Sequence, residues 1–193
     1  MIELAILGLL KERPMHGYQL SRELSDQLGG LWRVSFGSLY PSLRRLERQG
    51  AITSEAGTGA RRKTVYAITE EGERMFLELL EEAPQEGQTE DARFRVRLAF
   101  FRYLPPETRV RLLERRRNAL DTRLAEIKSH LRDAGTTDDY QRALVDHARA
   151  ATEADIAWLN QLIRNERLRS EITAPVGERR RASATLRRKE RTT

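Results

Sequence analysis

The sequence predicts a mainly α-helical fold, with an N-terminal winged helix-turn-helix that carries a two-stranded wing and a C-terminal antiparallel helical domain. Three observations predict it. Three short segments with helical apolar spacing come first, the spacing then alternates on both sides of a glycine-rich turn, and two long amphipathic segments fill most of the second half. With 193 residues, 39% of them hydrophobic, the chain can bury at least one core.

The first part of the chain predicts three short helices, over residues 2–11, 16–28 and 35–49, the last beginning at Ser35 or at Ser38. Apolar side chains recur three or four positions apart within each segment, which places them on one face of a helix. A proline or a glycine follows each segment and ends it. The residues expected to face inward are Ile2, Ala5, Ile6, Leu9, Tyr18, Leu20, Leu24, Leu28, Leu39, Leu43 and Leu46.

A hairpin is predicted to follow the third helix. Residues 51–55 and 64–68 are rich in β-branched and aromatic side chains, and the glycine-containing residues 57–60 separate them. Thr69 then provides an N-cap for a helix over 70–82, whose acidic first turn complements the helix dipole. The start of the returning strand carries three cations, which are Arg61, Arg62 and Lys63.

Three further helices are predicted in the second half, over residues 91–104, 107–132 and 138–170. The polar stretch 83–89 precedes them and contains both proline and glycine, so it is the best candidate for a domain boundary. The last two helices are long and amphipathic, and the chain offers too few neighbours to cover their apolar faces. We therefore expect a second copy of the chain to cover them, which makes the protein a homodimer.

These segments predict a winged-helix domain over residues 1–82, a helical dimerisation domain over 91–172 and a basic tail over 173–193. Lysine and arginine outnumber aspartate and glutamate by four within residues 1–69 and by five within 177–193. Two basic segments indicate a polyanionic partner. The tail is mostly arginines and small polar residues, too poor in apolar surface to offset the entropy of ordering, so we expect it to be disordered.

The composition excludes several classes of function. The chain has no cysteine, which rules out a disulfide framework, a thiolate nucleophile and a cysteine-ligated metal. Its histidines, His16, His130 and His147, lie far apart in the sequence, so we expect neither a metal nor another cofactor. The sequence shows no cluster of polar residues of the kind that an active site needs, so we do not expect an enzyme. The chain has no basic leader and no run of about 18 apolar residues, so we expect a cytoplasmic protein without a membrane partner.

The third predicted helix combines an apolar face with a polar one, as a helix that enters the major groove must. With Leu39, Leu43 and Leu46 inward, hydroxyl and guanidinium side chains remain to bond phosphates or base edges. The candidate DNA contacts on this helix are Ser38, Tyr40, Ser42, Arg44, Arg45 and Arg48, and those on the wing are Arg61, Arg62 and Lys63.

Pro41 leaves two positions open for the start of this helix. If Ser38 is the N-cap, Pro41 lies in the first turn, where its missing N–H costs nothing. If the helix begins at Ser35, the proline ring faces the carbonyl of Gly37, a residue whose lack of a side chain eases the fit. Both alternatives place the proline near the start of the helix.

Three motifs together resemble the PadR family of transcriptional regulators. They are HGYQL at residues 16–20, GSLYPSLRRLERQG at 37–50 and RKTVYAITEEG at 62–72. The resemblance implies a homodimeric, nucleoid-associated bacterial transcription factor, usually a repressor, which binds an inverted-repeat operator in double-stranded DNA. In that family the C-terminal helices form the dimer interface, and a small hydrophobic or phenolic effector often binds near it and releases the DNA.

The residues that we expect to line an effector pocket are Trp158, Asp155 and Phe94. An aromatic residue at helical spacing is also typical of a core, and Asp155 on the same stripe is either a buried ion-pair partner or a solvent-facing residue. A second function stays open. In it the winged helix is a protein-interaction module whose basic face binds an acidic protein partner.

Overall fold

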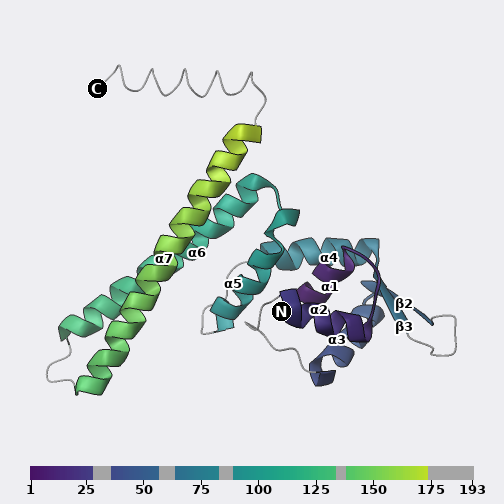
Figure 1. Cartoon of the computed structure of the whole chain (residues 1–193), viewed down its shortest axis with the longest axis horizontal. Helices are drawn as coiled ribbons and strands as arrows, with labels where there is room; N and C mark the ends of the chain where they lie inside the picture. The colour runs from purple at the N-terminus through teal and green to yellow at the C-terminus, as the bar shows by residue number, and fades with distance from the viewer. Residues whose placement is uncertain (28–35, 57–63, 83–88, 134–137, 174–193) are drawn as a thin grey trace. The chain divides into compact units, whose positions relative to one another are not determined.

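The computed structural model divides into two compact units, Met1–Leu104 and Pro105–Thr193 (Figure 1). The disorder expected for the tail concerns residues 174–193, which lie outside the described part of the chain. Arg61, Arg62 and Lys63 of the expected wing also lie outside it. The residues that the structure describes are 1–27, 36–56, 64–82, 89–133 and 138–173.

The described part of the first unit consists of helices and a small sheet. The helices are α1 (Ile2–Leu10), α2 (Gly17–Gln27), α3 (Phe36–Arg48), α4 (Glu70–Glu81) and α5 (Thr89–Ala99), followed by the short 3-10 helix η1 (Phe101–Tyr103). The strands are β1 (Met15–His16), β2 (Ile52–Ala56) and β3 (Thr64–Ile68). Each helix and strand expected in this part of the chain is present, so the predicted order is confirmed.

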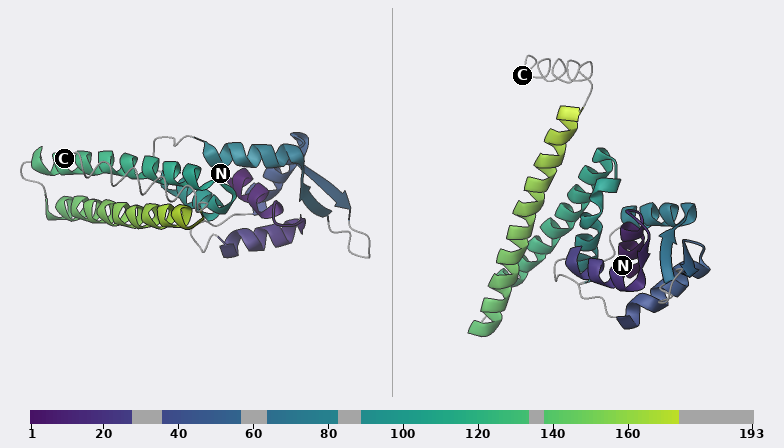
Figure 2. Two further views of the ribbon diagram at one scale, coloured as in Figure 1. Left: turned by 90° about the horizontal axis from the view of Figure 1, so that it is seen from above. Right: turned by 45° about the vertical axis from the view of Figure 1, so that its right-hand side comes forward.

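The sheet is antiparallel, with β3 between β1 and β2. Ile52 of β2 lies opposite Ile68 of β3, and Met15 of β1 lies opposite Tyr66. Strand β1 was not expected, because two residues are too few to show an alternating pattern. It joins the chain before α2 to the β2–β3 hairpin, which extends from the helices in Figures 1 and 2.

Helix α1 forms the centre of the first unit. Its residues from Leu4 to Leu10 are all buried, and it packs against α2, α3, α4 and α5. Gly8 allows Phe100 to approach closely, because a Cβ at this position would overlap the Phe100 ring. The predicted domains placed residues 91–104 in the helical domain, whereas this contact joins the end of α5 to α1.

The joint between α3, β2 and α4 is fixed by backbone contacts. Thr69 caps α4 as predicted, since its Oγ1 accepts a hydrogen bond of 3.1 Å from the N–H of Gly72. The same hydroxyl donates to the carbonyl of Gly50 over 2.6 Å. Gly50 has a φ of 71° and lies two residues after Arg48, the last residue of α3, which confirms its role as a helix stop. A Cβ on Gly72 would overlap the carbonyl oxygen of Ala51.

Pro41 lies inside α3, because the helix begins at Phe36. The structure therefore favours the earlier of the two expected starts. The N–H that proline lacks would have donated to the carbonyl of Gly37, one turn before it. The first turn of α3 thus carries one backbone carbonyl without its usual helical donor, on the exposed side of the helix.

The described part of the second unit is a hairpin of two long helices, α6 (Pro106–Asp133) and α7 (Asp139–Thr173). They lie side by side in Figures 1 and 2. Arg109 pairs with Glu166 over 3.0 Å and Lys128 pairs with Glu153 over 3.0 Å, so residue numbers rise along one helix as they fall along the other. The predicted mainly α-helical fold with an antiparallel helical region is confirmed.

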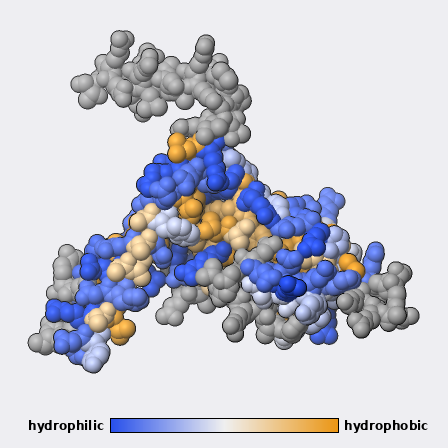
Figure 3. All heavy atoms as spheres, in the orientation of Figure 1, coloured by the Kyte–Doolittle hydropathy of each residue, from blue (hydrophilic) through white to orange (hydrophobic). Residues whose placement is uncertain are grey.

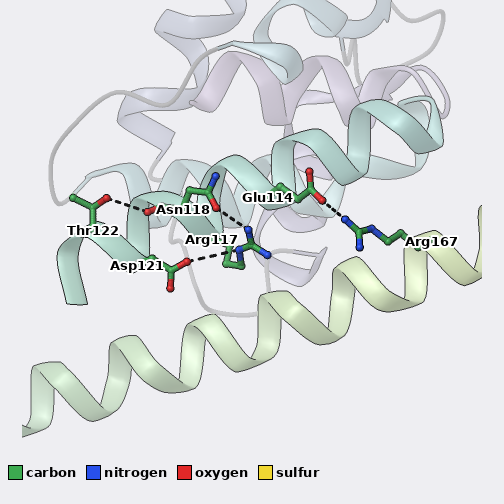
Figure 4. Close-up of polar contacts among 6 residues, drawn as sticks. All are labelled: Glu114, Arg117, Asn118, Asp121, Thr122 and Arg167. Atoms are coloured by element: carbon green, nitrogen blue, oxygen red, sulfur yellow. Dashed lines mark hydrogen bonds and ion pairs between the residues drawn. The ribbon is translucent and has the colours of Figure 1, made fainter. Parts of the chain in front are cut away.

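Polar contacts cross between these helices beside a buried apolar layer. Figure 4 shows Glu114 of α6 facing Arg167 of α7, with which it forms an ion pair. Arg117 is held instead by its own helix, at 2.8 Å from the Asn118 side-chain oxygen and 3.7 Å from Asp121. The buried layer between the ion pairs is formed by Leu113, Leu120, Leu159 and Ile163. The crossing pairs therefore help to fix the register of the hairpin.

Candidate nucleic-acid interface

Helix α3 has one buried and one exposed face. Leu39, Leu43 and Leu46 are buried, and the helix packs against α1, α2 and β2, as the spacing predicted. The exposed face combines hydroxyl and guanidinium groups, which can bond both phosphates and base edges. The expected contacts that lie on this exposed face are Ser38, Tyr40, Arg44, Arg45 and Arg48.

Ser42 is a correction to the expected set. Its side chain is only 2% exposed, and its Oγ donates a hydrogen bond of 2.9 Å to the carbonyl of Ser38, one turn back along the helix. A hydroxyl that is buried and satisfied within its own helix is not presented to a duplex. Ser42 therefore belongs to the buried face of α3.

Tyr40 packs on the start of α2 and also reaches the surface. A Cβ on Gly17, the first residue of α2, would lie 3.2 Å from the Tyr40 hydroxyl oxygen and 3.2 Å from its ring. The side chain remains 41% exposed. The ring of Tyr40 therefore rests on the start of α2, while a large part of the residue faces solvent.

The three arginines of α3 differ in their surroundings. Successive residues of an α-helix lie about 100° apart around its axis, so Arg44 and Arg45 point in different directions. Arg45 turns toward α1, where its Nη1 lies 3.3 Å from Oε1 of Glu3. The Nε of Arg48 lies 3.4 Å from the carbonyl oxygen of Arg44, within α3 itself. Arg44 and Arg48 occupy the middle of the exposed face, and Arg45 occupies the edge next to α1.

The opposite edge of α3 is joined to the hairpin. Glu47 accepts a hydrogen bond from the hydroxyl of Ser54 on β2. Tyr66 of β3 also interacts electrostatically with this edge of α3. Burial raises the pKa of Tyr66 above its ordinary value of 10.0, and the charge of Glu47 raises it further. The charge of Arg44 lowers it. The hairpin and the exposed face of α3 therefore form one continuous surface.

Tyr18 is an interface candidate that the sequence reasoning missed. It was expected to face inward with Leu20 and Leu24, but its side chain is 66% exposed. Two positions along a helix correspond to about 200° around the axis, so its distance from Leu20 already indicated the opposite face. Tyr18 follows Gly17, against which Tyr40 packs, and it adds a second aromatic hydroxyl near the start of α2.

The three residues expected in an effector pocket belong to different units. Phe94 is buried in the first unit, where its ring meets the edge of Phe101 with 6.2 Å between centroids. Trp158 is exposed and Asp155 is half-buried on α7 of the second unit. The role of Phe94 in the structure is thus that of a core residue.

A small open hollow of about 90 Å³ lies in the first unit. Arg97 is almost fully buried beside it, 3.6 Å from the carboxylate of Glu90, and donates a 3.1 Å hydrogen bond to the carbonyl of Glu82. None of the three expected pocket residues lines this hollow, whose lining is Met1, Leu4, Leu79, Glu82, Arg93 and Arg97. In the described part of the chain, no group of three or more histidine, aspartate and glutamate residues could hold a metal.

Comparisons with known proteins match both halves of the chain. Residues 6–87 match the model of the "Transcriptional regulator PadR-like family", and residues 92–167 match a model described as "Virulence activator alpha C-term". "Transcriptional regulator Rv3488" of Mycobacterium tuberculosis is 37% identical over 98 residues, which cover 47% of this chain and 89% of that protein. "Negative transcriptional regulator PadR" of Bacillus subtilis is 32% identical over 76 residues, and the match spans only 41% of its length.

The chain is also similar to solved structures of a relative. Bacillus subtilis PadR in complex with operator DNA is 20% identical, covers 86% of this chain and 98% of its own, and has a TM-score of 0.42. The same regulator in complex with p-coumaric acid has a TM-score of 0.40 at 20% identity and the same coverage.

The order of helices and strands in the first unit and the exposed basic face of α3 define a winged helix-turn-helix protein. The family matches narrow this class, and they agree with the resemblance that the motifs carried. This chain belongs to the PadR-like family of transcriptional regulators. Among the described residues, no helix has both the length and the apolar character needed to cross a membrane.

Proposed function

We propose that this protein is a sequence-specific, double-stranded DNA-binding repressor that acts as a homodimer on an inverted-repeat operator. The observation that carries the proposal is the division of α3. Its three leucines are buried, while Arg44, Arg48 and Tyr40 face outward beside the β2–β3 hairpin. A helix with this division can enter the major groove without exposing the core. The name of the Bacillus subtilis relative supports repression.

The position of each side chain assigns it a role in this proposal. Arg44 and Arg48, in the middle of the exposed face, reach base edges and the nearest phosphates. The hydroxyl of Tyr18, near the start of α2, and that of Tyr40, near the start of α3, form hydrogen bonds with the DNA backbone. The hairpin serves as the wing and brings Arg61, Arg62 and Lys63 to the neighbouring groove.

The exposed side of α7 supports the homodimer. Leu144, Ala151 and Trp158 are all exposed and lie seven residues apart, which places them on one line along the helix. Figure 3 shows apolar residues in a broken line on the visible side of the α6–α7 hairpin, between hydrophilic ones. In the proposed dimer a second copy covers the line of Leu144, Ala151 and Trp158, and the two α3 helices dock in major grooves about 34 Å apart, one turn of DNA.

A small hydrophobic or phenolic effector completes the proposed mechanism. Trp158 and Asp155 offer an aromatic surface and a carboxylate on α7, where a second copy would bring further side chains. Binding of an effector there would change the distance between the two α3 helices and release the operator. The proposed site now consists of Trp158 and Asp155, because Phe94 is part of the core of the first unit.

The first experiment selects DNA from a random library with the full-length protein and sequences it. We expect an enriched inverted repeat. On that duplex, Arg44→Ala and Arg48→Ala should each weaken binding about tenfold or more, because loss of one base or phosphate contact costs roughly 1–3 kcal/mol. Arg74→Ala is the matched control, because Arg74 lies on α4 and pairs with Glu71 of the same helix.

Two outcomes would contradict the proposal. If no sequence is enriched and the protein binds no duplex, the alternative of an acidic protein partner is favoured. If an inverted repeat is enriched but Arg44→Ala and Arg48→Ala bind it like Arg74→Ala, the exposed face of α3 is not the DNA contact.

A further inference from the structure

The ion pair between Glu3 and Arg45 joins the start of α1 to the proposed recognition helix. The Nη1 of Arg45 lies 3.3 Å from Oε1 of Glu3, and the side chains are 54% and 22% exposed. Oε1 of Glu3 is itself shut off from solvent and has no hydrogen-bond partner among the described residues. Among the described contacts, the guanidinium of Arg45 is thus the positive charge nearest to this carboxylate oxygen. The α-amino group of Met1 also interacts with Glu3.

In the proposed complex, the position of Arg45 on α3 places it nearer to the DNA backbone than to the base edges. It lies about 100° around the helix from Arg44, at the edge of the exposed face. When a helix sits in the major groove, its middle faces the base edges and its flanks face the phosphate strands. The exposed guanidinium of Arg45 is therefore within the region where a phosphate would attract it.

Glu3 and a DNA phosphate are competing partners for Arg45. Both are anions, and a guanidinium that is oriented to pair with one of them is not oriented to pair with the other. The carboxylate of Glu3 stands on the same edge and would repel an approaching phosphate. Phosphate contacts add affinity without reading sequence. A carboxylate at this place therefore lowers binding to every duplex to a similar extent.

We propose that Glu3 withholds Arg45 from the DNA backbone and so limits the sequence-independent part of the affinity. This inference rests on the proposed DNA-binding function. It separates two adjacent arginines that the sequence presents as equivalent: Arg44 contacts DNA, while Arg45 is held in reserve by α1. The ratio of operator binding to unrelated DNA binding stays high because the helix makes fewer contacts that every duplex can satisfy.

The test measures the dissociation constants of the full-length protein for its selected operator and for an unrelated duplex of equal length, over a range of salt concentrations. Glu3→Gln removes the charge and keeps the shape. We expect it to bind both duplexes roughly three- to tenfold tighter near 0.1 M salt. The slope of log K against log salt should steepen by about 0.9 for each phosphate newly contacted.

Three further variants locate the effect. Arg45→Gln alone should bind within about twofold of the natural protein, whereas Arg44→Gln should bind much more weakly. The double variant Glu3→Gln with Arg45→Gln should lose the gain of Glu3→Gln. Glu12→Gln is the matched control, since Glu12 follows the other end of α1 and pairs with Arg102, away from α3. Circular dichroism melting checks that each variant is folded.

Several results would overturn the inference. They are an unchanged or weaker affinity of Glu3→Gln, a gain that persists without Arg45, a gain equal to that of Glu12→Gln, or a loss in Arg45→Gln as large as that in Arg44→Gln. The Arg45→Gln result decides the matter even if Glu3→Gln fails to fold. Failure of the proposed function would look different, because the natural protein would then bind neither duplex.

Discussion

Gly17 and Gly72 hold positions where an added side chain would meet a neighbour, and the two neighbours differ in how easily they can move. A Cβ on Gly72 would overlap the carbonyl oxygen of Ala51, which is backbone and cannot move without distorting the start of β2. A Cβ on Gly17 would meet Tyr40 at 3.2 Å, and that side chain can shift toward solvent. The same substitution should therefore affect folding at one position and DNA binding at the other.

Gly72→Ala should lower the free energy of unfolding by about 2–3 kcal/mol, as expected when an atom is forced into a packed site. Gly17→Ala should cost less than about 1 kcal/mol, because only a partly exposed ring has to move. Urea unfolding followed by circular dichroism measures both, and a gel shift should detect weaker operator binding in Gly17→Ala. Equal stabilities of the two variants would contradict the contacts described for Gly72.

Single residues also show where the sequence was a sufficient guide. Leu39 and its partners on α3 were assigned correctly, since apolar spacing determines which face is buried. Ser42 and Tyr18 were not, because a small hydroxyl fits a buried face once its own helix satisfies it, and an aromatic ring fits an exposed one. The contact between Glu3 and Arg45 joins distant parts of the chain, and local periodicity carries no signal for it.

At the scale of helices, the α6–α7 hairpin combines apolar packing with ion pairs of different burial. Arg109 and Glu166 are 20% and 15% exposed, whereas Lys128 and Glu153 are about half exposed. Loss of one partner from a largely buried pair leaves a charge without compensation. Loss of one partner from an exposed pair leaves a charge that water solvates. The two pairs should therefore contribute differently to the stability of the hairpin.

Glu166→Gln should lower the free energy of unfolding by roughly 1–3 kcal/mol, because it leaves Arg109 without a counter-charge in a mostly buried place. Glu153→Gln removes the same charge from the exposed pair and should cost less than about 1 kcal/mol. Thermal unfolding of the full-length protein at constant salt compares them. If Glu153→Gln is as destabilising as Glu166→Gln, burial does not decide the strength of these pairs.

Whole helices were easier to foresee than short strands. The long helices follow from a spacing repeated over many turns, and their bounds agree closely with those expected. Strand β1 depends instead on Met15 and His16 finding β3, far along the chain. Such a pairing is set by tertiary packing, which also determines that α5 meets α1 through Phe100 and Gly8.

For the whole molecule, the exposed line of Leu144, Ala151 and Trp158 on α7 is the main argument for a second copy. An apolar residue repeated every seven positions along a helix is the pattern of helices that pair side by side. If two chains associate along it, each chain brings one α3 to an inverted repeat. Affinity for the complete operator then depends on the pairing of the chains as well as on the contacts of each α3.

Trp158→Glu should convert the protein to a monomer, because it places a charge in the proposed interface. Operator affinity should fall strongly, while affinity for a half-site should change little. Light scattering after gel filtration measures the mass. Ala157→Glu is the matched control, since position 157 is also exposed but points about 100° away around the helix. If Trp158→Glu keeps the assembly mass of the natural protein, this side of α7 is not the dimer interface.

The insertion of Phe100 over Gly8 has a practical consequence for anyone who wishes to use the DNA-reading half by itself. Phe76 contacts the same ring edge to face at 5.8 Å, and Tyr103 adds a further ring at 5.5 Å from Phe76. A fragment cut after α4 would lack Phe100 and Tyr103, so it would leave Phe76 and the side of α1 at Gly8 without the rings that cover them. A portable version should therefore extend to Leu104, where the compact unit ends.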